Sequence, residues 1–206
     1  MRTEHLYAND PGTIERAADL LKQGQLVVFP TDTVYGVGAD TFDEAAIESL
    51  YRVKERSLEK GIPILLADGE DVHKVACEIP ASAKLLLERF WPGPLTLIVP
   101  RRDGLPPNIS PNNKIAVRIP DSDVARALIR AAGGALATTS ANLSGDPPAH
   151  NASEALRALE GRVAAVVDGG EVNHGVPSTI VDCTVEPPRI LRRGALNVEA
   201  LALYEA

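Results

Sequence analysis

The sequence predicts one α/β domain. Short apolar runs that fit buried strands alternate with stretches of helical periodicity along all 206 residues. No change of composition, internal repeat or low-complexity tract marks a second domain. Several links between successive elements are too short to hold a helical crossover, so we expect antiparallel strand pairs in the sheet.

The first helix and the first buried strand are expected before Pro30. Thr13 should cap a helix that Gly24 ends, because the apolar residues between them recur at helical spacing. Residues 26–29, Leu-Val-Val-Phe, form an apolar run that fits a buried strand. Pro30 has no backbone donor, so pairing should weaken there and the chain should turn out of the sheet.

Small polar residues and two glycines follow that strand. We interpret this stretch as a strand-to-helix connection with a glycine turn, a common position for ligand sites in open α/β sheets. Gly36 and Gly38 would let the backbone approach another group closely or adopt a positive φ. A capping box over residues 41–44 would open the next helix. The apolar stripe of that helix continues to Lys54, which therefore leans inward. Its ammonium either reaches water along a packed stem or enters a cleft.

The middle of the chain contains the strand that carries Arg118. Strands are expected over 62–66, 95–99 and 114–119, a weak helical turn over 71–76, a helix over 81–90 and a loop over 101–113. Within 114–119, alternation places Ile115 and Val117 on one face and Arg118 on the other, next to Ala116. Arg118 then has open space beside it. A solvent-facing arginine on a half-exposed sheet fits the alternation equally well.

The last third of the chain contains a strand of small residues. Helices are expected over 122–132, 153–159 and 197–204, and strands over 135–139, 163–167 and 178–182, with 189–191 leading into an arginine-rich turn. Thr138 and Ser140 share a strand face, and their small size should leave a hollow above the sheet. Hydroxyl and amide groups at this strand end could cap the next helix or donate to phosphate oxygens.

Ten polar residues lie where strands or helices end, and they are our candidate site. They are Thr33, Lys54, Arg56, Lys60, Arg118, Thr138, Ser140, Asn142, Ser178 and Arg192. Cations and neutral donors dominate the set, so their convergence would make a positive pocket for a small polyanion. No nucleophile with a paired base, metal-ligand spacing, Walker motif or strand-borne GxGxxG is present in the sequence.

The composition narrows the class of protein. A formal charge of −7 argues against coating of nucleic acid by bulk electrostatics, although it leaves room for a local basic cleft. No N-terminal apolar h-region and no apolar run of membrane-spanning length occur, so we expect no membrane association. Two widely separated cysteines favour a reducing compartment, and the expected location is the cytoplasm.

Several short motifs, in their order and spacing, resemble the YrdC family. They are Pro-Thr-Asp-Thr-Val-Tyr-Gly at 30–36, Lys-x-Arg at 54–56, Ser-x-Asn-x-Ser-Gly at 140–145, Ser-Thr-Ile-Val-Asp at 178–182 and Arg-Ile-Leu-Arg-x-Gly at 189–194. The resemblance covers about residues 13–200. It implies a twisted mixed α/β sheet with flanking helices and a positively charged concave cleft. It also implies one YrdC-like domain over residues 1–206, the short form without an additional C-terminal domain.

The resemblance implies an L-threonylcarbamoyladenylate synthase, a nucleotidyltransferase. Such enzymes convert L-threonine, bicarbonate and ATP into threonylcarbamoyl-AMP and pyrophosphate. The product feeds a tRNA modification beside the anticodon through downstream transfer proteins. Mg²⁺ is expected to arrive with ATP, without metal ligands from the protein and without a tightly bound organic cofactor.

The resemblance also assigns roles to the candidate residues. Lys54 and Arg56 take catalytic positions. Thr33, Arg118 and Ser178 match threonine-binding positions. The nucleotide-binding positions are Arg56, Lys60, Thr138, Ser140, Asn142 and Arg192. The longer branch of the family usually has asparagine at the place of Lys60 and histidine at the place of Leu65, so this chain departs from that branch at both.

Two other functions remain open at this stage. One is an RNA-binding factor in ribosome or tRNA maturation, which would use the same basic cleft for weak RNA binding. The net charge, the 4% aromatic content and the absence of basic runs make it secondary. The other is a carbamoyl-transfer domain like that of hydrogenase maturation factors. Those normally carry an acylphosphatase domain and zinc-finger cysteines, which this sequence lacks.

Overall fold

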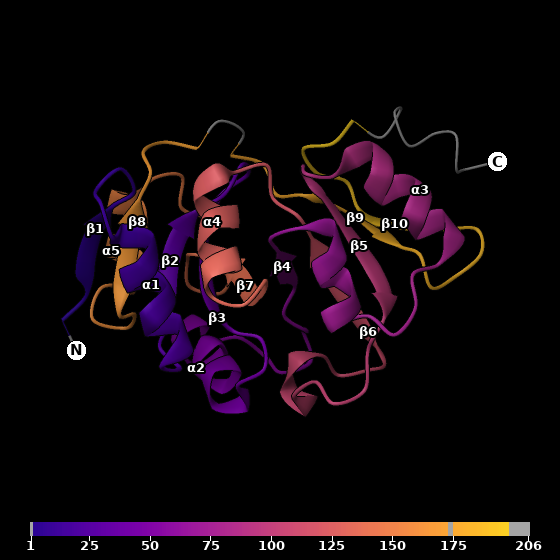
Figure 1. Ribbon diagram of the computed structural model, residues 1–206, viewed down its shortest axis with the longest axis horizontal. Helices are drawn as coiled ribbons and strands as arrows, with labels where there is room; N and C mark the ends of the chain where they lie inside the picture. The colour runs from indigo at the N-terminus through magenta and orange to yellow at the C-terminus, as the bar shows by residue number, and fades with distance from the viewer. Residues whose placement is uncertain (1, 173–174, 198–206) are drawn as a thin grey trace.

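A ten-stranded sheet crosses the molecule in the computed structural model, which describes residues 2–172 and 175–197 (Figure 1). Its strands are β1 (Glu4–Tyr7), β2 (Val27–Pro30), β3 (Tyr35–Asp40), β4 (Ile64–Leu66), β5 (Leu95–Pro100), β6 (Lys114–Arg118), β7 (Ala135–Ser140), β8 (Ala165–Asp168), β9 (Thr179–Asp182) and β10 (Arg189–Arg192). Their order in space is β1-β8-β2-β3-β7-β4-β6-β5-β9-β10. The pairs β2–β3, β3–β7, β4–β7, β5–β6 and β9–β10 are antiparallel, and the others are parallel. The predicted α/β class and the antiparallel pairs are confirmed.

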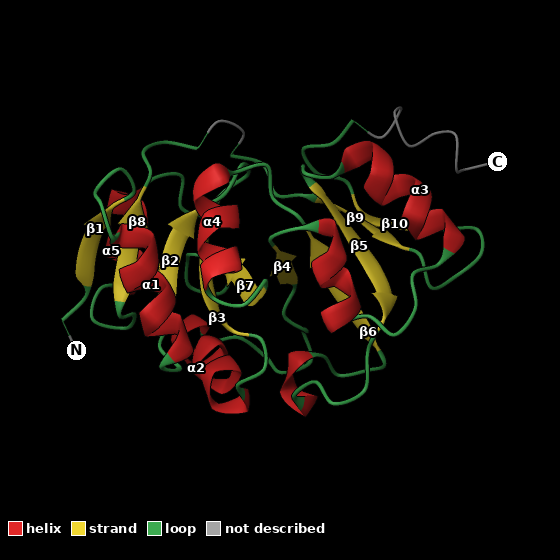
Figure 2. Ribbon diagram, in the orientation of Figure 1, coloured by secondary structure: helices red, strands yellow, loops and turns green. Residues whose placement is uncertain are grey.

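Helices cover both faces of the sheet (Figure 2). They are α1 (Thr13–Lys22), α2 (Glu44–Lys54), α3 (Ala81–Phe90), α4 (Asp123–Ala131) and α5 (Ala152–Leu159), with 3-10 turns at Gly69–Lys74 and Pro107–Ile109. Helices α1 and α4 lie side by side and pack with Val27 and Phe29 into one apolar cluster (Figure 1). Buried residues of α2, α3 and α5 pack with Val28 into the other. Successive residues of β2 thus enter opposite clusters, as strand alternation requires.

The predicted glycine turn is wrong, because Gly36 and Gly38 lie inside β3. This strand pairs with β2 on one side and β7 on the other. A Cβ at Gly36 would come within 2.8 Å of the Thr138 methyl group, and one at Gly38 within 2.8 Å of the Phe29 ring. The glycines therefore let neighbouring side chains lie directly against the backbone of a strand. The turn out of β2 occurs earlier, over residues 31–34.

Two predicted helix caps are also wrong. Gly12, with a φ of 80°, occupies the N-cap of α1, and the hydroxyl of Thr13 donates instead to the Tyr7 carbonyl at 2.8 Å. Helix α2 is capped by Asp43, whose carboxylate accepts from two backbone N–H groups, rather than by a box beginning at Thr41. In both cases the N-cap is a residue one or two positions away from the predicted one.

The other predicted elements are present with shifted ends, and the helix over 81–90 has the predicted bounds. Strand β1 was not predicted, because its four residues show no apolar run. The helix expected over 197–204 lies outside the described residues apart from its first position. Among the helices that the structure describes, none combines the length and the apolar character needed to cross a bilayer.

Candidate functional site

A cavity of about 370 Å³ opens on the sheet beside β6 and β7. Its walls come from the β2–β3 turn, from β5, β6 and β7, from the segment after β7 and from the chain around β9 and β10. Most of the predicted residues line it: Thr33, Arg56, Arg118, Thr138, Ser140, Asn142, Ser178 and Arg192. The hollow expected above the small residues of β7 is present. Lys54 and Lys60 are not among the lining residues.

Arg118 ends β6 and is only 5% exposed, so it is not a solvent-facing arginine. Its Nε donates to the Gly93 carbonyl at 2.9 Å, its Nη1 donates to the Thr33 hydroxyl at 3.0 Å, and its Nη2 forms an ion pair with Asp32. Burial lowers the pKa of Arg118, and Asp32 opposes that shift. A guanidinium has five N–H groups. Three are engaged here, so two remain for a ligand.

The turn between β2 and β3 directs Thr33 toward that guanidinium. The Thr31 hydroxyl donates to the Val34 carbonyl at 2.6 Å and accepts from the backbone N–H of Thr33 and Val34 at 3.2 and 3.3 Å. Asp32, at the tip, has a side chain that is only 8% exposed, and its Oδ2 has no hydrogen-bond partner among the described residues. The turn therefore fixes a counter-charge and a hydroxyl against Arg118.

Lys54 lies beneath the cavity wall rather than in it. It is 2% exposed, which confirms that it leans inward. Its ammonium donates to the carbonyls of Ser140 and Asn142 at 2.5 and 2.6 Å and to the Asn142 side-chain oxygen at 3.2 Å. Burial lowers its pKa to about 8, and the charge of Arg56 adds to this effect. The ammonium thus holds the backbone after β7 in place, and its charge reaches the cavity indirectly.

Arg56 lines one edge of the cavity, whereas Lys60 does not. The guanidinium of Arg56 donates to the carbonyls of Lys60 and Gly61 at 3.1 and 3.0 Å and so closes the loop that follows α2. The side chain of Lys60 is exposed, and its nucleotide-binding role stays a prediction. Leu65, on β4, lines the cavity at the position where the longer branch of the family carries histidine.

Arg192 is the second guanidinium of the cavity floor. Its Nε and Nη2 donate to the Ser178 carbonyl at 3.0 and 2.8 Å, and Nη2 also donates to the Ser178 hydroxyl at 3.2 Å. Burial lowers the pKa of Arg192, and repulsion from Arg118 lowers it further. Arg118 and Arg192 both line the cavity, so their positive charges face the same space. An anion bound between them would relieve that repulsion.

Thr96 is a lining residue that the sequence interpretation missed. It lies on β5, 3% exposed, and its hydroxyl is 2.7 Å from that of Ser178. The available signal was the alternation of Leu95, Thr96 and Leu97, which places the threonine on the face opposite two buried leucines. The alternation indicated which face of the sheet Thr96 lies on, but it did not indicate that this face binds a ligand.

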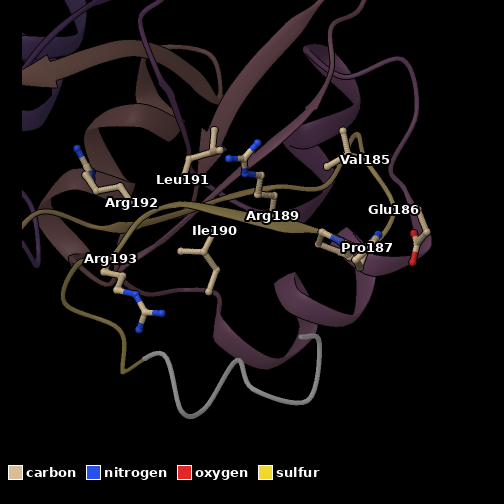
Figure 3. A pocket seen from close by; sticks show the side chains of 9 residues that line it. Val185, Glu186, Pro187, Arg189, Ile190, Leu191, Arg192 and Arg193 are labelled. Atoms are coloured by element: carbon tan, nitrogen blue, oxygen red, sulfur yellow. The ribbon is translucent and has the colours of Figure 1, made fainter. Parts of the chain in front are cut away.

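A more open hollow of about 790 Å³ lies along β10, over residues 185–193 (Figure 3). Arg192 and Arg193 point to opposite sides of the strand in this view, and Arg192 is the residue that this hollow shares with the cavity. The walls of the hollow come from one segment that includes the exposed side chains of Val185 and Leu191. Buried polar side chains from several strands line the smaller cavity, so we assign the functional site there.

Comparison with known proteins identifies the family. The family model for Sua5, YciO and YrdC proteins, described as "Telomere recombination", matches residues 19–194. The chain belongs to the Sua5/YciO/YrdC family. Its twisted mixed sheet superimposes on the crystal structure of Pyrococcus abyssi Sua5 complexed with L-threonine with a TM-score of 0.94, at 36% identity over 99% of this chain. The chain spans 61% of that Sua5 chain.

Curated members of the Sua5/YciO/YrdC family carry a functional name. The Bacillus subtilis threonylcarbamoyl-AMP synthase is 40% identical over 97% of this chain, which spans 58% of that relative. The Methylococcus capsulatus threonylcarbamoyl-AMP synthase is 37% identical, and the match covers 81% of this chain and 90% of that relative. All five family motifs noted in the sequence contribute residues to the cavity of this family member.

Proposed function

We propose that this chain is an L-threonylcarbamoyladenylate synthase that converts L-threonine, bicarbonate and ATP into threonylcarbamoyl-AMP and pyrophosphate. The reaction is a nucleotidyl transfer. The observation that carries the proposal is the convergence of two guanidiniums, that of the buried Arg118 and that of Arg192, on one cavity. Such a pair favours a ligand with more than one anionic group. Relatives named threonylcarbamoyl-AMP synthase, and a Sua5 structure complexed with L-threonine, support this choice of ligands.

The amino-acid end of the cavity is assigned to Arg118. Its two unengaged N–H groups would hold the threonine carboxylate in a fork geometry that a lysine lacks. Thr33 and Ser178 lie beside it and offer hydroxyl groups for the remaining polar atoms of threonine. Asp32 keeps the guanidinium in one orientation, so little order is lost when the substrate binds.

The nucleotide end is assigned to Arg56, Ser140 and Arg192, with Thr138 and Asn142 completing the wall. The amino group of threonine and bicarbonate form a carbamate with loss of water. A carbamate oxygen then attacks the α-phosphorus, the new P–O bond forms, and pyrophosphate leaves with the electron pair of the broken bond between the α-phosphorus and the bridging oxygen. Both reactants are anions, so positioned cations lower their repulsion and orientation supplies further acceleration. Lys54 acts by holding the Ser140 and Asn142 backbone rather than by touching phosphate.

We further propose that Mg²⁺ enters with ATP and neutralises charge on the phosphates. The product would pass to proteins that transfer the threonylcarbamoyl group to tRNA. An RNA-binding factor is not favoured, because the named relatives are synthases.

One assay tests the proposal. The protein is incubated with ATP, Mg²⁺, bicarbonate and isotopically labelled L-threonine, and the products are analysed by mass spectrometry and by pyrophosphate release. A labelled adenylate that requires threonine, bicarbonate and ATP together is the expected result. Reactions lacking each substrate in turn are the controls. A folded protein that yields no such adenylate would overturn the proposal and return attention to RNA binding.

A further inference from the structure

One row of side chains crosses four neighbouring strands on the floor of the cavity. Leu97 of β5 pairs with Val117 of β6 in antiparallel register, so the preceding Thr96 lies opposite Arg118. Thr96 pairs with Ile180 of β9, and Ile180 pairs with Arg192 of β10. Residues in one row project from the same face of a sheet. Thr96, Arg118, Ile180 and Arg192 all line the cavity, so Thr96 lies in the row between the two guanidiniums.

The hydroxyls of Thr96 and Ser178 together carry two protons, and only one of them is engaged in a hydrogen bond within the described residues. Each hydroxyl has one proton to donate and two lone pairs. One proton lies between the two oxygens, which are 2.7 Å apart. Arg192 Nη2 can only donate, so its hydrogen bond uses a lone pair of the Ser178 oxygen and leaves the hydroxyl proton of Ser178 unengaged. Over residues 2–172 and 175–197 no further acceptor is present for either hydroxyl. The second proton is therefore available to a ligand in the cavity.

We propose that Thr96 is a ligand-binding residue whose hydroxyl donates a hydrogen bond to the carboxylate of the amino-acid substrate. In this arrangement Arg192 donates to Ser178, Ser178 donates to Thr96, and Thr96 donates to the ligand. Each bond in such a chain polarises the next. The two unengaged N–H groups of Arg118, the neighbour of Thr96 in the row, hold the same carboxylate. The inference rests on the proposed function and adds a residue that selects for an acceptor oxygen.

Two substitutions separate this role from a structural one. Thr96→Val keeps the branched shape and removes the hydroxyl, whereas Thr96→Ser restores a hydroxyl. A lost hydrogen bond to a charged group corresponds to about a tenfold or larger change in affinity. We therefore expect Thr96→Val to weaken L-threonine binding about tenfold in isothermal titration calorimetry. Thr96→Ser should restore affinity to within about twofold, and nucleotide affinity should change little in both.

Thr13→Val is the matched control. Thr13 is also buried, and its hydroxyl also makes one hydrogen bond, but it lies on α1 and does not line the cavity. This variant should bind L-threonine like the wild type. Should the valine at position 96 prevent folding, Thr96→Ala makes the same test, with thermal unfolding of each variant measured alongside.

The outcomes separate this inference from the proposed function. If the wild type forms the adenylate and Thr96→Val binds L-threonine with unchanged affinity, the inference is wrong and the proposed function stands. If Ser178→Ala weakens binding while Thr96→Val does not, the available proton belongs to Ser178 and the inference is again wrong. If the wild type neither binds L-threonine nor forms product, both fail. A selective loss in Thr96→Val that serine rescues supports both.

Discussion

Replacing Arg118 by lysine is the most direct test of how the cavity recognises its ligand. The guanidinium donates to the Gly93 carbonyl, the Thr33 hydroxyl and Asp32, and two of its five N–H groups have no partner among the described residues. A lysine carries one compact ammonium at the end of a flexible stem. It could retain the ion pair with Asp32, but it could not also reach the other two acceptors and a bound carboxylate.

The size of the effect follows from those contacts. A buried acceptor that loses its donor costs about 1–3 kcal/mol, so two such acceptors should lower the free energy of unfolding of Arg118→Lys by roughly 2–6 kcal/mol. Loss of the forked contact removes charge-assisted hydrogen bonds and should raise the threonine KM by about ten- to a hundredfold. The ATP KM should stay within about twofold, because Arg56 and Arg192 are retained.

The assay is initial-rate pyrophosphate release with one substrate varied at saturation of the other, together with urea unfolding. Arg130→Lys is the control, because Arg130 is an exposed arginine that pairs with Asp68 outside the cavity. It should change neither KM and should shift stability by less than about 0.5 kcal/mol. An equal rise in both KM values for Arg118→Lys would refute the assignment of Arg118 to the amino acid.

Three further perturbations test the framework around the cavity. Lys54→Met removes the ammonium from the carbonyls of Ser140 and Asn142, so the free energy of unfolding should fall by roughly 2–6 kcal/mol in urea titrations. Nucleotide affinity should also fall in calorimetry, and an unchanged affinity in the folded variant would contradict the positioning role. Gly38→Ala puts a Cβ 2.8 Å from the Phe29 ring and should cost about 1–3 kcal/mol in the same titration; a neutral result would mean that β3 moves freely. Hydrogen bonds from Arg130 and Arg126 lower the pKa of Asp68 from 3.8 to about 2. Its stabilisation is therefore present above pH 3.8 and is lost as the pH falls toward 2. Asp68→Asn should have the lower melting temperature at pH 6 and should approach the wild type near pH 2, as thermal unfolding by circular dichroism would show; a constant difference across that range would exclude the linkage.

Much of the fold could be predicted because local signals agreed with the tertiary structure. Apolar runs marked most strands, and Pro92 with its neighbours marked the end of α3 at Phe90. Strand β3 could not be predicted, since glycine disfavours strands and nothing local shows which side chains press against it. Thr138 and Phe29, which require Gly36 and Gly38, lie on other strands. The information that fixes β3 is therefore nonlocal.

The candidate site shows the same division. Alternation placed Arg118 on the face away from Val117, and the helical stripe placed Lys54 inward; both are confirmed by their burial. Neither pattern could name a partner. Asp32 for Arg118, and the carbonyls of Ser140 and Asn142 for Lys54, depend on how strands distant in the sequence pair. Thr96 was missed for that reason, since the role proposed for it depends on its neighbours in the row.

Contacts from neighbouring residues explain how this family member holds two partly desolvated arginines in one cavity. Burial disfavours the charged forms of Arg118 and Arg192, and repulsion from Arg118 adds to that cost for Arg192. Asp32 offsets it for Arg118, and the Ser178 carbonyl offsets it for Arg192. The remaining free-energy cost of desolvating the two arginines is met during folding, before any ligand binds. An anionic ligand therefore meets donors that are already oriented and that gain a counter-charge on binding, which is how a preorganised site favours binding and transition-state stabilisation together.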